Sequence, residues 1–151
     1  VWVTGSTYNH IGSALAAERG CTFDVEDLAA GFITFENGAS LVIEASWGAN
    51  IREREFMETR LYGTKGGLVQ HNVEETYKFE AELYVERDGS QFDTKLHPVS
   101  QPPRNAMYHF VEAIVKGEPH TATGEEGLIV MEILDAIYKS AALRQPVRIA
   151  D

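Results

Sequence analysis

Three consecutive residues near the start of the chain carry side chains that suit the binding of a small polar molecule. Tyr8, Asn9 and His10 lie in a segment that contains Gly12, Gly20 and many small residues. Their phenol, amide and imidazole groups can donate or accept hydrogen bonds, and an imidazole also exchanges protons near neutral pH. We therefore predict that these three residues bind a substrate, the alternative for His10 being an ordinary surface histidine.

Two further residues are candidates for contact with a ligand. Arg104 directly precedes a predicted helix, and its guanidinium group suits an acidic or hydroxylated substrate. We predict a substrate-binding role for Arg104, with an ordinary surface arginine as the alternative. Trp47 ends the apolar face of a predicted strand. We interpret it as a core residue, and stacking on a sugar ring is the alternative.

Glu26 and Asp27 form an adjacent pair of carboxylates, a pattern that in some sites supports acid and base catalysis. Neighbouring residues of a strand point to opposite faces, so the two groups would not share a site. We favour a structural interpretation, in which one carboxylate is solvated and the other is hydrogen-bonded at the start of a strand. The sequence therefore offers no catalytic residue in this pair.

Other chemistries receive no support from the residue pattern. The five histidines show no spacing typical of a metal site, and no serine lies on a Gly-x-Ser-x-Gly turn. The lone cysteine, Cys21, cannot form a disulfide within the chain, which fits a reducing compartment. We expect no metal site, and we expect a cytoplasmic location.

Length and charge narrow the class of partner. The 151 residues fit one domain, residues 1–151, and 44% of them are hydrophobic. The net charge of -10 and the dispersed Lys and Arg disfavour nucleic acids, whose binding requires cations that neutralise phosphates. No apolar stretch approaches the roughly 20 residues that span a bilayer. We expect neither a nucleic acid nor a membrane as a partner.

Alternating apolar and polar residues, bounded by turn sequences, predict most of the chain to be strand. Asn37 and Gly38 separate two such runs and predict a tight hairpin, because both residues tolerate positive φ. Asp88 and Gly89 give a second hairpin signal. The predicted strands are residues 1–6, 28–35, 39–47, 56–62, 68–70, 75–87, 92–99 and 147–149.

Two helices are predicted in the last third of the chain. Apolar residues recur at helical spacing from Ala106, and Gly117 ends that run. Thr123 and Glu126 have the spacing of a capping box, which predicts a second helix that reaches about residue 143. Residues 8–22 show no clean period, so we predict a long loop there, with a helical turn at 14–19 at most.

These elements predict an α+β fold with a large, mostly antiparallel, open sheet of six to eight strands. Both helices would pack on one face of the sheet. The other face mixes apolar residues such as Val42 and Tyr84 with polar ones, and no remaining element covers it. We therefore predict that this face is free for dimerisation, giving a homodimer or a tetramer.

Three ordered stretches resemble one oxidoreductase family. They are residues 24–47, residues 61–67 and the set 110–114, 125–128, 133–141 and 146–149. The first contains Asp24-Val25-Glu26-Asp27 and Phe35-Glu36-Asn37-Gly38, and the second reads Leu61-Tyr62-Gly63-Thr64-Lys65-Gly66-Gly67. In this order they resemble the C-terminal substrate-binding domain of the glucose-fructose oxidoreductase/inositol dehydrogenase (Gfo/Idh/MocA) family.

The resemblance implies a parent enzyme that uses NAD or NADP to oxidise or reduce a sugar, a cyclitol or a related polyol. This chain would supply a wall of the substrate cleft and a subunit interface. The family's catalytic residues lie in Glu-Lys-Pro and Asp-x-x-x-His stretches, which do not occur here. We therefore expect them upstream of Val1, together with a dinucleotide-binding Rossmann domain.

The resemblance carries no catalytic or cofactor-binding residue into this chain. Residues 63–67 are rich in glycine, but they join two predicted strands and open no helix, unlike a dinucleotide-binding turn. The fragment alone is therefore predicted to be inactive and to bind no cofactor. The alternative is a stand-alone module that binds a small molecule or serves as a scaffold without catalysis.

Overall fold

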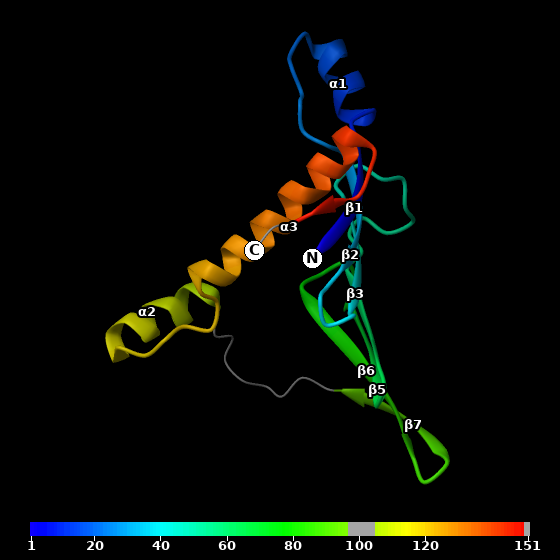
Figure 1. The fold of residues 1–151 in the computed structure, drawn as a ribbon, viewed down its shortest axis with the longest axis vertical. Coiled ribbons are helices and arrows are strands. Elements are labelled where there is room, and N and C mark those ends of the chain that lie inside the picture. The colour runs from blue at the N-terminus through cyan, green and yellow to red at the C-terminus, as the bar shows by residue number, and fades with distance from the viewer. Residues whose placement is uncertain (97–104, 150–151) are drawn as a thin grey trace. The chain divides into compact units, whose positions relative to one another are not determined.

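The structure is a computed structural model that describes residues 1–96 and 105–149. The chain divides into two compact units (Figure 1). The first unit combines residues 1–50 with residues 106–151, and the second comprises residues 51–105. His97 and Arg104, like the predicted strand end at 97–99, lie outside the described residues.

The first unit contains a four-stranded antiparallel sheet, here called sheet A, with the strand order β3-β2-β1-β8. Its strands are β1 (Trp2–Tyr8), β2 (Leu28–Thr34), β3 (Ser40–Ser46) and β8 (Val147–Arg148). The predicted hairpin between β2 and β3 is confirmed. Gly38 adopts a φ of 85°, and the Asn37 side chain accepts a hydrogen bond from the Ala39 N–H at 3.0 Å.

Helix α3 (Gly124–Leu143) packs against sheet A along β1 (Figure 1). The core between them consists of Val3, Ile33, Ala136 and Ile137, each no more than 4% exposed. Val3 and Ile33 are cross-strand partners, so they present one apolar surface to the helix. Burying such side chains contributes about 1.5–3 kcal/mol each to stability.

Two glycines bring α3 unusually close to sheet A. A Cβ atom on Gly5 or Gly31 would lie only 2.7 Å from the Ile137 side chain. The Gly5 N–H also donates to the Ser140 hydroxyl at 2.9 Å, and this hydroxyl donates to the Gln145 carbonyl at 2.7 Å. The buried Ser140 thus ties the end of α3 to the middle of β1.

Sheet A is covered less completely than the sequence predicted. Leu41 and Ile43 share the α3 side of the sheet, yet they are 41% and 36% exposed. On the opposite face, Phe32 of β2 is 49% exposed. A helix about 10 Å wide covers roughly two strands that are about 4.8 Å apart. Because α3 lies over β1, the edge strand β3 extends beyond the covered part of the sheet.

The predicted helix boundaries in the last third are confirmed. The capping box is complete: the Thr123 hydroxyl accepts from the Glu126 N–H at 3.2 Å, and the Glu126 carboxylate accepts from the Thr123 N–H at 3.0 Å. Helix α2 (Ala106–Lys116) ends at Gly117, whose φ is 66°. Its apolar stripe stays largely exposed, and Val115, for example, is 79% exposed.

The loop predicted for residues 8–22 is wrong, because a nine-residue helix, α1 (Ile11–Arg19), occupies most of it. The helix ends at Gly20, which has a left-handed φ of 65°. The Gly20 N–H donates to the carbonyls of Ala16 and Ala17. Gly20 therefore gave a local stop signal. The start of the helix carries no comparable local signal, since His10 offers no side-chain cap.

The second unit is a four-stranded antiparallel meander, here called sheet B, with the order β4-β5-β6-β7. Its strands are β4 (Glu58–Gly63), β5 (Gly66–Val73), β6 (Lys78–Arg87) and β7 (Ser90–Leu96). Asp88 and Gly89 both adopt positive φ, 52° and 73°, as the predicted hairpin requires. The glycine-rich residues 63–67 join β4 to β5, also as predicted.

The α+β class and the antiparallel pairing are thus confirmed, but the described strands form two sheets of four, where one larger sheet was predicted. Residues 47–57 contain no strand, so the ladder of β3 does not continue into β4. Alternation within a strand reports which face a residue occupies. It carries no information on which strands pair across such a gap.

Candidate functional site

Three chain segments meet where the strands of sheet A end. Tyr8 at the end of β1 pairs with Leu28 at the start of β2, and Leu28 pairs with Ser46 at the end of β3. Helix α1, residues 20–27 and Trp47 extend from these strand ends. We call this part of the molecule, residues 8–28 with 46–47, the α1 edge.

Asp27 holds the start of α1 in place. Its carboxylate is buried, with 4% of the residue exposed, and accepts hydrogen bonds from the Ile11 N–H at 2.5 Å and the Gly12 N–H at 3.2 Å. These N–H groups have no partner within the helix, and a negative charge at a helix start is favourable. The structural interpretation of Asp27 is therefore confirmed.

Asn9 connects α1 to the segment that leads into β2. Its side-chain oxygen accepts from the Ser13 N–H at 3.0 Å and from the Ser13 hydroxyl at 2.7 Å. Its amide nitrogen donates to the Phe23 carbonyl at 3.1 Å. Both ends of the Asn9 side chain thus contact the chain itself, so that the amide positions the neighbouring groups.

Tyr8 and His10 lie at the same edge, and their side chains are more exposed than that of Asn9. Tyr8 is 45% exposed, and its ring centroid lies 6.3 Å from that of the exposed His10. The chain therefore presents a phenol at the end of β1 and an imidazole just before α1 to solvent. Such a pair can bind hydroxyl groups of a ligand from one side.

Trp47 is 58% exposed, so its interpretation as a core residue is wrong. It follows the edge strand β3, beyond the part of sheet A that α3 covers. The indole is nevertheless held in place, because its Nε1–H donates to the Glu26 carbonyl at 2.9 Å. The preceding Ser46 hydroxyl donates to the Asp27 carbonyl at 2.6 Å and accepts from the Ala49 N–H.

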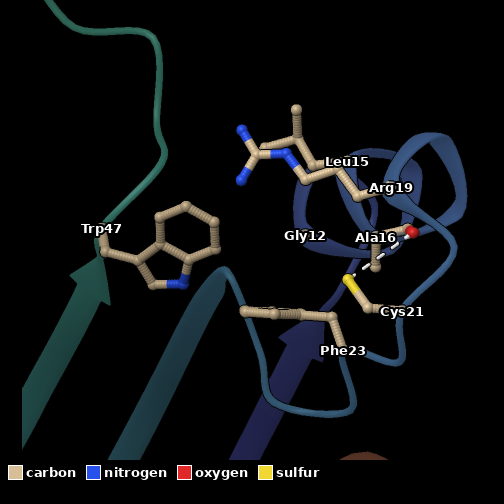
Figure 2. A pocket seen from close by; sticks show the side chains of 7 residues that line it. All are labelled: Gly12, Leu15, Ala16, Arg19, Cys21, Phe23 and Trp47. Atoms are coloured by element: carbon tan, nitrogen blue, oxygen red, sulfur yellow. Dashed lines mark hydrogen bonds between the residues drawn. The ribbon is translucent and has the colours of Figure 1, made fainter.

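A hollow of about 210 Å³ opens between α1 and Trp47 (Figure 2). Phe23 and Trp47 contribute its aromatic walls, with ring centroids 5.5 Å apart and planes inclined by 58°. The Arg19 guanidinium group is directed toward the same opening (Figure 2). The remaining lining residues are Gly12, Leu15, Ala16 and Cys21.

Gly12 allows Phe23 to form that wall. A Cβ atom at position 12 would lie 2.2 Å from the Phe23 ring, so any larger residue would displace it. Gly12 is buried in α1, and its N–H is one of the two that Asp27 accepts. The start of the helix and the wall of the hollow are therefore built from the same contacts.

A second hollow of about 260 Å³ at the α1 edge shares Trp47 with the first. It is more polar, with Glu26, Asp27 and Ser46 in its lining. A hydrogen bond from the Tyr138 hydroxyl lowers the pKa of Glu26 from its ordinary 4.5 and raises the pKa of Tyr138. Glu26 therefore presents a charged carboxylate at neutral pH.

The structure brings together three of the four predicted substrate-binding residues. Tyr8, Asn9 and His10 all lie at the α1 edge, whereas Arg104 lies outside the described residues. Arg19 and Phe23 were not predicted to line a hollow. No local pattern singles them out, since each is separated in sequence from Trp47, which completes the site.

Neither metal ligands nor a dinucleotide cradle occur among the described residues. No group of three or more His, Cys, Asp or Glu side chains converges in residues 1–96 and 105–149. The glycines of residues 63–67 join two strands of sheet B, and they precede no helix that could hold a pyrophosphate. None of the helices in the described part is long and apolar enough to cross a membrane.

Comparison with known proteins identifies related chains. A family model described as the C-terminal alpha/beta domain of an oxidoreductase family matches residues 3–149. A D-glucoside 3-dehydrogenase of Escherichia coli (strain K12) is 31% identical over 123 residues, which cover 80% of this chain and 32% of that protein. This chain thus spans about a third of the length of that relative.

Solved structures share the fold. A levoglucosan dehydrogenase in complex with NADH and levoglucosan matches 99% of this chain and 45% of its own, with a TM-score of 0.76 and 20% identity. An aldose-aldose oxidoreductase from Caulobacter crescentus, complexed with glycerol, matches 99% of this chain and 41% of its own, with a TM-score of 0.71 and 20% identity. At these identities the likeness establishes the fold.

Proposed function

Because the chain belongs to the Gfo/Idh/MocA oxidoreductase family, as its C-terminal alpha/beta domain, we propose that it forms the substrate-binding wall of an NAD-dependent sugar oxidoreductase. The relatives support a sugar or a sugar derivative such as a glucoside as the substrate, within the wider class of cyclitols and polyols. The levoglucosan dehydrogenase complex with NADH supports NAD as the cofactor of the parent enzyme.

One observation of this chain carries the proposal. The α1 edge presents Tyr8 and His10 to solvent, while Asp27 and Asn9 fix the backbone that carries them. Exposed hydrogen-bonding side chains on a rigid support are what a binding wall needs, because rigid support limits the entropy lost when the ligand binds. Elsewhere on sheet A, the exposed faces offer mainly short or apolar side chains.

The glycine segment between β4 and β5 joins two strands and opens no helix, which supports a cofactor site outside the described residues. In the proposed parent enzyme, NAD would be held by the Rossmann domain that precedes this domain in the family. When bound, the nicotinamide exchanges a hydride with a carbon that bears a hydroxyl group. Tyr8 and His10 would orient the sugar through hydroxyl groups away from that carbon.

The test uses the full-length parent enzyme and follows NADH formation with methyl β-D-glucoside as the substrate. We expect His10→Ala and Tyr8→Phe to raise the KM for the glucoside about tenfold, the loss of roughly one hydrogen bond. The KM for NAD should stay unchanged, because the cofactor lies elsewhere. His120→Ala serves as a matched control, since this histidine packs against Phe110, away from the α1 edge.

The proposal would be overturned in two ways. One is an unchanged KM for the glucoside in both α1-edge variants. The other is saturable binding of NAD or NADP by the isolated chain in a calorimetric titration, which would place the dinucleotide site within the chain itself.

A further inference from the structure

We infer that the hollow between α1 and Trp47 binds the aromatic aglycone of a glucoside, with Arg19 contacting an anionic oxygen on the aromatic ring. The inference rests on the proposed function, since it specifies which sugar derivatives the substrate-binding wall accepts. It assigns the aglycone to one hollow of the α1 edge and leaves the sugar to the remainder of that edge.

The lining of the hollow favours an aromatic ring. The Phe23 and Trp47 rings contact each other, with centroids 5.5 Å apart and planes inclined by 58°, and so form one angled aromatic wall. A ligand ring that rests on this wall meets one side chain in an offset stack and the other at its edge. Aromatic pairs prefer both arrangements. Leu15 and Ala16 complete an apolar surface, and apart from Arg19 and the Cys21 thiol the lining side chains carry no strong hydrogen-bonding group aimed at the opening.

The size of the hollow agrees with that assignment. Its volume of about 210 Å³ exceeds the roughly 150 Å³ of an apolar cavity that holds benzene. A sugar ring of similar size would lose hydrogen bonds to water on entering it, and each unsatisfied hydroxyl costs about 1–3 kcal/mol. The apolar lining therefore selects the aglycone over the sugar.

The aromatic walls are held in position before any ligand arrives. The Trp47 indole is anchored by its hydrogen bond to the Glu26 carbonyl. The Phe23 backbone is tied to Asn9, and its ring lies against the Cα of Gly12. Little side-chain freedom remains to be lost on binding, which favours affinity.

Arg19 supplies the charge that selects an anionic substituent. It lies in the last turn of α1, its side chain lines the hollow, and no salt bridge within residues 1–96 and 105–149 occupies it. The chain has a net charge of -10, so most of its surface disfavours an anion. The Arg19 guanidinium group gives this hollow a local positive charge that attracts one. A guanidinium group also matches the planar geometry of a carboxylate.

The two hollows of the α1 edge differ in polarity and share Trp47. The lining of the second includes Glu26, whose carboxylate oxygens suit sugar hydroxyls, whereas the first is largely apolar. A glucoside that crosses the indole would place its sugar on the polar side and its aglycone on the apolar side. The indole of Trp47 can thus contact both the sugar and the aglycone of one glucoside.

Cys21 provides a direct readout, because it is the only cysteine, it is exposed, and it lines the hollow. The experiment measures the rate at which iodoacetamide alkylates Cys21 in the 151-residue chain, with increasing concentrations of three glucosides. We expect 4-carboxyphenyl β-D-glucoside to protect the thiol best and phenyl β-D-glucoside to protect it less. Methyl β-D-glucoside, which has no aromatic ring, should leave the rate unchanged.

Two variants separate the contributions. We expect Arg19→Gln to weaken the binding of 4-carboxyphenyl β-D-glucoside about fivefold, the effect of losing a solvent-accessible ion pair. The binding of phenyl β-D-glucoside should stay unchanged. Trp47→Leu should weaken the binding of both aryl glucosides about tenfold. Arg144→Gln is the matched control, because Arg144 is exposed at the end of α3 and lies outside the hollow.

Equal protection by methyl and phenyl glucosides would show a sugar site in the hollow and would overturn the inference. So would an absence of protection by either aryl glucoside in the unmutated chain. Neither result touches the proposed function, which depends on NADH formation and on the His10 and Tyr8 variants of the full-length enzyme. Conversely, an enzyme that fails to oxidise glucosides, although aryl glucosides protect Cys21, would overturn the proposed function alone.

Discussion

At the scale of single residues, Asp27 joins the start of β2 to the start of α1. Its buried carboxylate accepts from two helix N–H groups, and its own N–H donates to the Tyr8 carbonyl at 2.8 Å. The Ser46 hydroxyl donates to the Asp27 carbonyl from β3. One residue thus connects all three segments of the α1 edge, so its loss should affect the whole edge.

We expect Asp27→Ala to lower the free energy of unfolding by about 1–3 kcal/mol, because it leaves the N–H groups of Ile11 and Gly12 without an acceptor. Urea unfolding followed by circular dichroism measures the change. Asp27→Asn keeps an acceptor oxygen and should cost less. Equal stability of all three proteins would show that α1 does not depend on this contact.

The hydrogen bond between Tyr138 and Glu26 makes stability depend on pH. It lowers the pKa of Glu26 below 4.5, so its contribution is present above that pH and is lost as the pH falls through the lowered pKa. It also raises the pKa of Tyr138 above 10.0, so its contribution is present below that pH and is lost as the pH rises through the raised pKa.

We therefore expect Tyr138→Phe to lower the melting temperature between about pH 5 and pH 9 and to have little effect near about pH 2. Thermal unfolding of both proteins across this range measures the difference. Tyr77→Phe is the control, because Tyr77 is 79% exposed and lies just before β6 in the second unit. A difference that stays constant down to the lowest pH would mean that the Glu26 charge is not involved.

At the scale of elements, α1 and α3 obtain their N-terminal caps in different ways. Helix α3 is capped by its own Thr123 and Glu126, which are three residues apart. Helix α1 is capped by Asp27, which lies 16 residues after Ile11. The first cap forms as soon as the helix does, whereas the second requires β1 and β2 to have paired.

We expect Thr123→Ala to lower the free energy of unfolding by about 0.5–2 kcal/mol, the usual cost of losing such a cap. Thr123→Ser keeps the hydroxyl and should remain close to the unmutated protein. Urea unfolding of the three proteins under identical conditions measures both values. If Thr123→Ala is no less stable than Thr123→Ser, the capping box contributes nothing to the folded state.

At the scale of the whole molecule, the face of sheet A away from α3 remains exposed. It carries Trp2, Phe32 and Val42, which are 53%, 49% and 74% exposed. Phe32 and Val42 are cross-strand partners, with Thr4 on the other side of Phe32, so they form a continuous row. Contiguous apolar groups of this kind mark interaction surfaces, and two-fold symmetry is the commonest way to cover them.

We therefore predict a homodimer through this face, or a tetramer in which two such dimers meet through a second interface. An obligate dimer interface should bury at least about 2,000 Å² in total. Val42→Lys should yield monomers with an unchanged circular dichroism spectrum, since Lys is accommodated on an exposed strand. Light scattering at micromolar concentration measures the mass. Ala17→Lys on α1 is the control, and a monomeric unmutated chain would contradict the prediction.

Some features of this protein follow from its sequence alone because they arise between near neighbours. The hairpins at Asn37-Gly38 and Asp88-Gly89 need positive φ only at Gly38, Asp88 and Gly89, and these residue types tolerate it. The capping box needs Thr123 and Glu126 at a spacing of three. Alternation with period two predicted the strands, and with the helical stretches it established the α+β class.

Tertiary structure alone decided the features that depend on which distant segments meet. Helix α1 has its cap on Asp27, and the hollow requires Arg19 and Phe23 to face Trp47 across more than twenty residues of chain. The division into two sheets and the exposure of Trp47 depend on where α3 lies and where strand pairing stops. Such contacts are selected by the packing of the whole unit, and no local pattern encodes them.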